Sequence, residues 1–470
     1  MCGQAPSYNV ASLISQDHHC DAVLMMNSDR ERCLRLIFWL GVSIGLLLSF
    51  GYQLNQIIGG DQTQMIHKGY LGAHHGIWLN VGNVASVVGN VPGSLSAGVV
   101  AAPLLLWDSP YAIIIFLTLL RLAGFLLLDA VVRQALPQST LVRLIFLLLI
   151  WLNPWVQYDS LLYNPAYLLF CAGLHLFSAW RLREQPSFWM TLIHVASIGL
   201  AMQLHFSWPL LAILSVYLWI RGLIRINWWA VVLAVAAIIV SLLPYLRQLI
   251  DNPEMARHSD PGVQDRYIGW GAVHVYPVLK SVIYWLRYGA WAFPSKLVND
   301  AGFGWITVAP WLALVMKVIW LGILYSLSVV TMVFSVIANV SAFKRIKPLW
   351  RAWRAPVNNT NWLLLYAFGA FVAVLISAAL SPLVFNYWHL VLILPAAVLP
   401  ILIWLVQTVY RGSEANLKPI WVCAAILIVV NLVAMTDSRK FSWEADYEEQ
   451  VLQYVENAVR APSGNVGSER

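Results

Sequence analysis

The sequence predicts an all-α fold: a polytopic bundle of about eleven transmembrane helices with two long extracytoplasmic loops. Hydrophobic residues make up 60% of the 470 positions, charged residues only 11%, and the mean hydropathy is +0.69. This leaves too little polar surface to cover a soluble globule of this size. Many apolar runs approach the roughly 20 residues that a helix needs to cross a bilayer. The 24 Trp and 19 Tyr residues fit a membrane protein, because such rings accumulate at the membrane–water interface.

The net charge of +7 indicates membrane topology and not nucleic-acid binding. Lys and Arg occur in short clusters between the apolar runs, which is typical of cytoplasmic loops. The five cysteines support no disulfide framework, because two lie inside apolar runs and three precede or open the first run.

The first span is expected at residues 34–52. Arg30, Arg32 and Arg35 lie at its start and should hold an N-terminal lead, residues 1–33, in the cytoplasm. We expect no cleavable signal peptide, because this run is long enough to span. Met1 and Met26 both remain open as the start of translation. The other expected spans are 111–132, 141–152, 166–180, 188–204, 209–220, 228–243, 310–340, 361–380, 388–405 and 419–435.

Two polar regions separate these spans as outer loops, residues 53–110 and 244–309. The first contains a short apolar run, 93–107, that we expect to lie in the interface or to re-enter the membrane. If it crossed, Arg133 and Arg143 would fall outside, against the positive-inside rule. The odd number of spans then places the tail, residues 436–470, outside as well. The transmembrane domain is residues 34–435.

Candidate polar groups gather on the extracytoplasmic side of this topology. Transporters and channels usually place such groups near the bilayer midplane, where this chain offers only Arg121 and Lys317. Asp129, near the cytoplasmic side, is expected to form a structural ion pair with Arg133 one helical turn away. The extracytoplasmic groups are Asp61, His67, Lys68, Asp159, His205, Arg247 and His389.

The order of several loose motifs resembles a family of membrane enzymes. These are "GGDQTQMIHKGYLGAHHGIW", "VPGSLSAGVVAAPLLLWDSPYA", "NPWVQYDSLLYNP", "GLAMQLHFSW" and "NYWHLVLILPA". Together they look like the bacterial membrane glycosyltransferases of the GT-C superfamily, whose relatives include protein O-mannosyltransferases and the aminoarabinose transferase of lipid A. The likeness runs from about residue 34 to 405. It implies a sugar donor carried on a polyprenyl phosphate.

The resemblance also implies site residues. Asp61 takes the first acidic position of the family's first outer loop, whereas Gln62 replaces the Glu that often follows it. Asp159 matches the placement of a second acid that some members carry, and Arg247 lies where relatives place a basic residue near the donor phosphate. Lys68, His67 and His205 are further candidates for binding the phosphate or the substrate.

The chemistry of such a transfer fits these residue types. A carboxylate is needed to take the proton of the acceptor hydroxyl, and a guanidinium suits the leaving phosphate. A single displacement would invert the anomeric carbon. Each residue also has a structural alternative. Asp61 could cap a helix, Asp159 could belong to a turn, His205 could pack in the core, and Arg247 could anchor its helix at the headgroups.

The predicted function is therefore transfer of a sugar from a polyprenyl-phosphate carrier to an extracytoplasmic lipid, glycan or protein, with Asp61 as general base. The resemblance places the enzyme in the bacterial inner membrane with its active site on the periplasmic side. No cofactor is certain; a divalent metal on His67, His74 and His75 remains open. Two alternatives also stay open: a transporter or flippase of glycolipid precursors, and a ligase that transfers whole glycans.

Overall fold

The computed structural model describes residues 10–56, 60–84, 89–136, 140–251, 253, 275–288, 290–291, 303, 309–350, 357–381, 385–408 and 417–435, with side chains from residue 29 onward. The lead before residue 10, the tail 436–470 and the greater part of the second outer loop lie outside these ranges. The predictions for the translation start and for the tail therefore stay predictions.

The described chain is almost entirely helical, which confirms the predicted fold class. The helices are α1 (Val10–Leu54), α2 (Gly60–His75), α3 (Leu95–Leu106), α4 (Pro110–Ala135), α5 (Thr140–Leu149), α6 (Pro154–Tyr158), α7 (Leu168–Leu182), α8 (Phe188–Leu204), α9 (Pro209–Ile220), α10 (Trp228–Asp251), α12 (Val275–Tyr288), α14 (Pro310–Ile346), α15 (Asn359–Leu380), α16 (Tyr387–Leu390), α17 (Leu394–Thr408) and α18 (Lys418–Met435). Short 3-10 helices are η1 (Asn164–Tyr167), η3 (Lys347–Trp350) and η4 (Val391–Ile393).

Seven helical segments in the described chain are long and apolar enough to cross a membrane, so the protein is a multi-pass membrane protein. They are Asp29–Leu54, Pro110–Ala135, Trp228–Asp251, Pro310–Trp350, Asn359–Leu380, Tyr387–Thr408 and Lys418–Met435. Four shorter apolar helices, α3, α5, α8 and α9, have 10–17 residues. The total of eleven spans stays a prediction. The 12 residues of α3 extend about 18 Å, well short of the roughly 30 Å hydrocarbon core.

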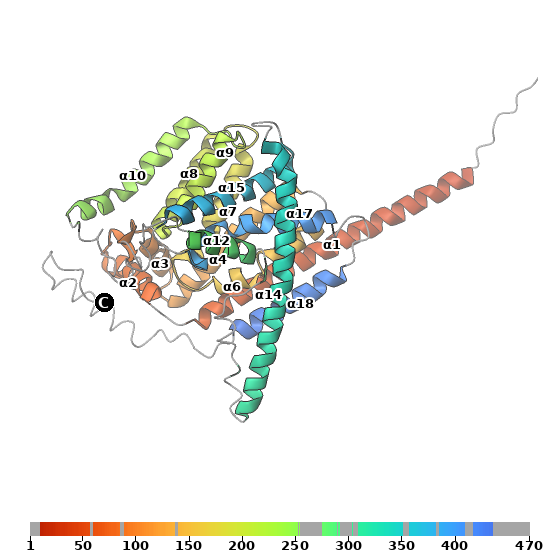
Figure 1. Ribbon diagram of the computed structural model, residues 1–470, viewed down its shortest axis with the longest axis horizontal. Coiled ribbons are helices and arrows are strands. Elements are labelled where there is room, and N and C mark those ends of the chain that lie inside the picture. The colour runs from red at the N-terminus through yellow and green to blue at the C-terminus, as the bar shows by residue number, and fades with distance from the viewer. Residues whose placement is uncertain are drawn as a thin grey trace, which may run out of the picture.

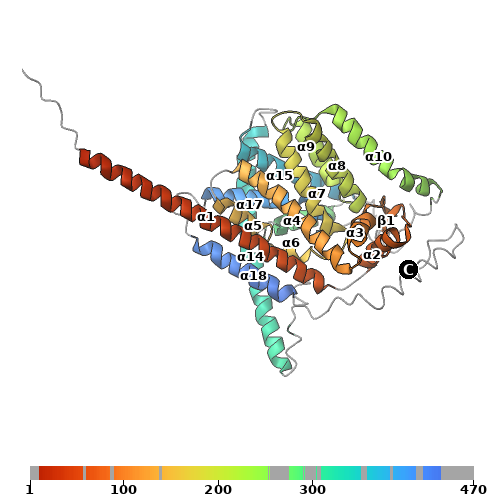
Figure 2. The same ribbon diagram turned by 180° about the vertical axis from the view of Figure 1, so that it is seen from behind.

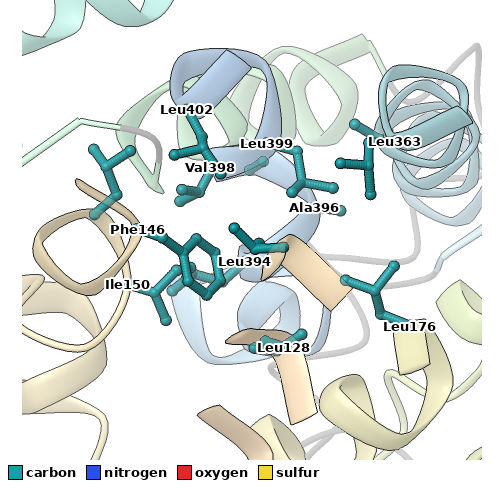
Figure 3. Close-up of a cluster of buried hydrophobic side chains, with 14 of the residues drawn as sticks. Leu128, Phe146, Ile150, Leu176, Leu363, Leu394, Ala396, Val398, Leu399 and Leu402 are labelled. Atoms are coloured by element: carbon teal, nitrogen blue, oxygen red, sulfur yellow. The ribbon is translucent and has the colours of Figure 1, made fainter. Parts of the chain in front are cut away.

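The helices pack around a central core to which α17 contributes a largely buried segment. Figure 3 shows side chains from α4, α5, α7, α15 and α17 meeting there, among them Leu128, Leu176 and Leu399. In Figure 1, α14 crosses the front of the bundle and extends beyond it, and α1 projects from one side. Figure 2 shows α18 beside α1, in agreement with their contacts. Many outward-facing side chains of α10 and α14 are apolar and exposed, as expected of lipid-facing surfaces.

Two glycines bring α4 and α7 into backbone contact. A Cβ atom at Gly124 would lie 2.7 Å from the carbonyl oxygen of Leu169, and one at Gly173 would lie 2.6 Å from the carbonyl oxygen of Gly124. No side chain fits in these gaps. Small residues of this kind are how membrane helices approach closely.

A buried polar network joins four helices on the cytoplasmic side of the predicted topology. The Nε2 atoms of His175 and His194 lie 2.8 and 3.0 Å from the hydroxyl of Ser215. The hydroxyl of Tyr366 lies 2.8 Å from Nδ1 of His175. The network thus ties α7, α8, α9 and α15 together with hydrogen bonds that a hydrocarbon environment cannot replace.

Asp129 forms a structural ion pair, but the predicted partner is wrong. Its two carboxylate oxygens accept from Nε and Nη2 of Arg143 on α5, with the shortest distance 2.6 Å. Arg133 is exposed. The one-turn spacing predicts neighbours on the same helix, whereas the packing of α5 against α4 turns Asp129 toward Arg143.

Candidate functional site

The first outer loop folds into a compact unit of α2, α3 and a two-stranded antiparallel sheet. The strands β1 (Val81–Val84) and β2 (Asn90–Pro92) were not predicted. Helix α2 packs on α3 and contacts β1. Gln64 of α2 accepts a hydrogen bond of 2.8 Å from the backbone N–H of Val84. This unit holds the first candidate acid at a defined place.

Asp61 lies in the first turn of α2, and its residue surface is exposed. Its carboxylate has no hydrogen bond or ion pair with any other described residue. Partial desolvation by the surrounding protein raises the pKa of this carboxyl above its usual range. Its backbone carbonyl accepts a 2.9 Å hydrogen bond from the side chain of Asn83. Asp61 is therefore fixed through its backbone while its carboxylate stays available, as a general base requires.

Lys68 and His67 follow on the same helix. Lys68 is buried, and its ammonium donates a 2.5 Å hydrogen bond to the carbonyl of Gly82 in β1. Burial lowers the pKa of Lys68 to about 8. Its contact ties α2 to β1, which is a structural role that the sequence did not predict. His67 is half-buried, and desolvation lowers its pKa.

Asp159 ends α6 and begins the turn that leads to η1. Asn153 caps α6 by accepting from the N–H of Trp155 at 2.9 Å. The Asp159 side chain is buried; Oδ1 accepts a hydrogen bond from the hydroxyl of Tyr163, and Oδ2 has no hydrogen-bond partner among the described residues. Burial raises the pKa of Asp159 to about 7, although the Arg121 guanidinium and the Tyr163 hydrogen bond oppose the rise. A carboxyl that titrates near neutral pH is suited to proton transfer.

The Arg121 side chain of α4 holds the Asp159 turn by donating to backbone carbonyls in and around the turn. Its guanidinium donates to the carbonyls of Asp159 at 3.0 Å, of Ala166 at 3.1 Å, and of Val156. No ion pair within 4.0 Å joins Arg121 to a described carboxylate. The midplane arginine of the sequence is thus a positioning residue for this turn.

A polar stripe at the end of α1 supports the same turn from another side. Ser49 donates to the side-chain oxygen of Gln157 at 2.9 Å. Gln56 accepts from the N–H of Leu162 at 2.8 Å. Between them Gln53 donates to the Thr118 hydroxyl on α4 at 2.7 Å. Ser49 and Gln53, four residues apart, share one face of α1, and Gln56 lies just beyond the end of this helix.

The two candidate acids are connected by asparagines. The Nδ2 of Asn83 donates to the Asp61 carbonyl and also to Oδ1 of Asn164, each at 2.9 Å. Asn164 starts η1, five residues after Asp159. The first outer loop and the Asp159 turn therefore share one hydrogen-bonded framework, and both acids lie on the same side of the bundle.

Helix α12 of the second outer loop supplies aromatic and basic groups that pack against Trp155 of α6, and Figure 1 shows the helix in the centre of the bundle. The ring of Trp155 lies 5.1 Å from that of Tyr288 and 5.6 Å from that of Tyr387. The Arg287 guanidinium lies 5.2 Å from the Trp155 ring and 5.4 Å from that of Tyr284. Burial lowers the pKa of Arg287 from a very high value. Arg287 therefore lies against Trp155, whose backbone carbonyl accepts from the N–H of Asp159 at 3.1 Å.

Sequence reasoning missed Arg287 and Lys280 as site residues. The signal was present, because Lys280, Tyr284 and Arg287 follow the i, i+4, i+7 spacing of one helix face. The sequence-based prediction recognised this stretch as amphipathic and placed it in the second outer loop, residues 244–309, but assigned no site role to its basic residues.

Arg247, the predicted phosphate ligand, lies elsewhere. It is exposed on α10 and has no hydrogen bond or ion pair with another described residue. The nearby Tyr245 hydroxyl reaches the carbonyl of Asn90 at 3.4 Å, so this end of α10 touches β2. The structure does not bring Arg247 into contact with either candidate acid.

His205 directly follows α8, as the fold predicts, and is half-buried near His389. The three loop histidines considered for a metal do not gather. His74 instead contacts Asp108 at 3.1 Å, and within the described ranges no three His, Cys, Asp or Glu side chains are placed to hold a metal ion.

No known protein family profile matches the chain, and no curated protein matches it either. A crystal structure of ArnT from Cupriavidus metallidurans in the apo state is similar to it. The two share 15% identity over 89% of this chain and 69% of the other, with a TM-score of 0.47.

Proposed function

We propose that this protein is a membrane glycosyltransferase that moves a sugar from a polyprenyl-phosphate carrier to an extracytoplasmic acceptor, with inversion at the anomeric carbon. The single observation that carries the proposal is the shared framework of Asp61 and the Asp159 turn. It presents an unpaired carboxylate at one side of an apolar bundle, and the cation Arg287 packs against Trp155 of the helix that ends at the second acid. The order of the sequence motifs supports the same reaction class.

The reaction needs one base and one anion-binding group. The Asp61 carboxylate takes the proton of the acceptor hydroxyl while the oxygen of that hydroxyl forms the bond to C1 of the sugar. The bond between C1 and the phosphate oxygen breaks, and the polyprenyl phosphate leaves with the electron pair. A guanidinium stabilises that leaving group well. We assign this task to Arg287 in place of Arg247, because Arg287 packs against Trp155 of α6, whereas Arg247 is exposed on α10 and Arg121 is engaged by three backbone carbonyls.

Asp159 has a supporting role in this proposal. With a pKa near 7 and a hydrogen bond from Tyr163, it can accept or hold a proton within the proposed site. Lys68 is left out of phosphate binding because its ammonium is buried and bonded to Gly82.

The donor assignment is tested with the full-length protein in nanodiscs. We expect transfer from a polyprenyl-phosphate sugar and none from the matching nucleotide sugar without a lipid carrier. Acceptors are found by comparing the surface glycolipids and polysaccharides of a deletion strain with those of its parent by mass spectrometry. Efficient transfer from the nucleotide sugar alone would refute the donor class.

Asp61→Asn tests the base. Asn caps a helix about as well as Asp, so the variant should insert and unfold like wild type. Losing a general base should lower the transfer rate about 100-fold or more. The matched control is Asp108→Asn in the same loop unit, whose exposed carboxylate pairs with His74; it should keep wild-type rates. Normal transfer by Asp61→Asn would end the catalytic assignment.

A further inference from the structure

Two histidines that the proposed reaction does not use, His205 and His389, lie close together. His205 follows α8, and His389 lies in α16, far apart in the sequence. Their ring centroids are 5.5 Å apart. Both side chains are half-buried. One small group can therefore reach both rings.

The hydrogen bonds fix the protonation of both rings. The backbone N–H of Ser207 donates to Nδ1 of His205 at 3.2 Å, and that of Asn386 donates to Nδ1 of His389 at 3.0 Å. A backbone N–H can only donate, so each Nδ1 is the acceptor nitrogen. A neutral imidazole then carries its hydrogen on Nε2. Burial and the nearby His389 lower the pKa of His205 to about 3, so this ring stays neutral.

Both Nε2–H groups lack a protein acceptor. Neither Nε2 atom has a hydrogen-bond partner within the described ranges. A metal ion is a poor occupant, because a metal needs the unprotonated nitrogen, and metal-bound histidines normally donate from their other ring nitrogen. Here the other nitrogen accepts. The pair presents two donors to a ligand that accepts.

Lys280 of α12 adds a positive charge to these donors. Its ammonium donates to Oδ1 of Asn386 at 2.8 Å, and Asn386 is the residue whose N–H fixes His389. No described carboxylate lies within 4.0 Å of Lys280. Two imidazole N–H donors and one ammonium cation, without an acid among the described residues within 4.0 Å of the ammonium, favour an oxyanion.

We propose that His205, His389 and Lys280 form a subsite for an oxyanion, a phosphate or a carboxylate. The subsite is separate from the group held by Arg287, because the seven residues between Lys280 and Arg287 correspond to about 10 Å along α12. We assign the oxyanion to the acceptor substrate. That assignment rests on the proposed function, whereas the subsite itself does not.

Binding is measured on full-length protein in nanodiscs of a zwitterionic lipid. The thermal unfolding midpoint is followed against inorganic phosphate, with sodium chloride at matched ionic strength as the reference, because a ligand of the folded state raises this midpoint. A second arm uses nanodiscs that contain phosphatidylglycerol. Phosphate should raise the midpoint in the zwitterionic discs. If the anionic lipid removes the phosphate response, a headgroup fills the subsite, and the acceptor assignment is overturned.

Substitutions test the individual donors. In His205→Asn the amide oxygen can still accept from the Ser207 N–H, but no donor remains at the Nε2 position; His205→Gln keeps a donor there. We expect phosphate to bind about tenfold or more weakly in His205→Asn and Lys280→Gln, the effect of losing a hydrogen bond to a charged group. His205→Gln should stay within about threefold of wild type.

Matched controls are His75→Gln in the first outer loop and Lys344→Gln at the far end of α14, both exposed. They should bind phosphate like wild type. Equal phosphate responses in every variant, or stabilisation by Zn²⁺ that His205→Asn removes, would overturn the subsite. If His205→Asn fails to fold, Lys280→Gln decides the question alone. Because no sugar transfer is needed, a failed transferase assay leaves this result unaffected.

Discussion

Two buried aspartates, each beside an arginine, behave differently in this molecule. Asp129 receives two nitrogens of Arg143 on its two oxygens. Asp159 lies next to Arg121, yet that guanidinium donates to three backbone carbonyls and leaves Oδ2 without a hydrogen bond. One carboxylate is fully paired, and the other is held in place but left partly unsatisfied.

The difference indicates which acid is structural. A buried pair with complete hydrogen bonding contributes to the packing of α4 against α5. A buried carboxyl with an unused oxygen and a pKa near 7 costs stability, and such groups are concentrated at functional sites. Arg121 positions the turn without neutralising its acid.

Removing the ion pair between Asp129 and Arg143 should have the largest effect on stability. Arg143→Gln leaves the Asp129 carboxylate buried without its partner, and the expected loss in unfolding free energy is about 3–5 kcal/mol. Arg133→Gln, on the exposed face of the same helix as Asp129, should change it by less than about 0.5 kcal/mol. Denaturation in mixed micelles, followed by circular dichroism, measures both. Equal losses in the two variants would contradict the assignment of Arg143 as the stabilising partner of Asp129.

Asp159→Asn should affect activity strongly and stability little, unlike Arg143→Gln. Activity should fall about 10- to 100-fold from the loss of a proton acceptor, while stability near neutral pH changes little or rises. The wild-type carboxyl binds a proton more tightly when folded, so its contribution to stability is lost as pH rises through about 7. The variant should lack this pH dependence of stability. The wild-type rate should rise as pH increases through about 7, because the Asp159 carboxyl accepts a proton only when it is ionised, and the variant should lack this rise as well. An unchanged rate profile would remove Asp159 from the reaction.

Tyr163→Phe should give the smallest effect. The tyrosine hydroxyl stabilises the Asp159 carboxylate, so its removal raises the pKa of Asp159 further. The rate profile should move to higher pH while the plateau rate above it is kept. Tyr276→Phe on the exposed face of α12 should leave the profile in place. A profile that moves to lower pH would contradict the assigned hydrogen bond.

Much of the helical arrangement could be predicted from the sequence, because the bilayer imposes a length and a composition on each span. The run at residues 310–340 became α14, and the short run at 93–107 became the 12-residue α3. The sequence also allowed Asp61 and Asp159 to be named as candidate acids from their place on the extracytoplasmic side of the predicted topology, and their catalytic roles stay predictions.

The partners of these acids could not be predicted, because they depend on helix rotation and on contacts between distant segments. The link from Asp61 through Asn83 to Asn164 joins three elements. The Trp155–Arg287 contact joins residues 132 positions apart. Lys68 looked like a phosphate ligand until its buried bond to Gly82 was known. Spacing in the sequence carries no information about such contacts.

The contact of Gly124 with Gly173 has a mechanical consequence. Helix α4 carries Arg121, and α7 continues directly from the Asp159 turn through η1. Since the two backbones touch, no side-chain rearrangement can change the separation between the arginine and the turn that it holds. The acid therefore belongs to a rigid frame. Any closure around the proposed lipid-linked donor has to come from the surrounding elements, α2 with its small sheet or α12, moving against a frame that stays fixed.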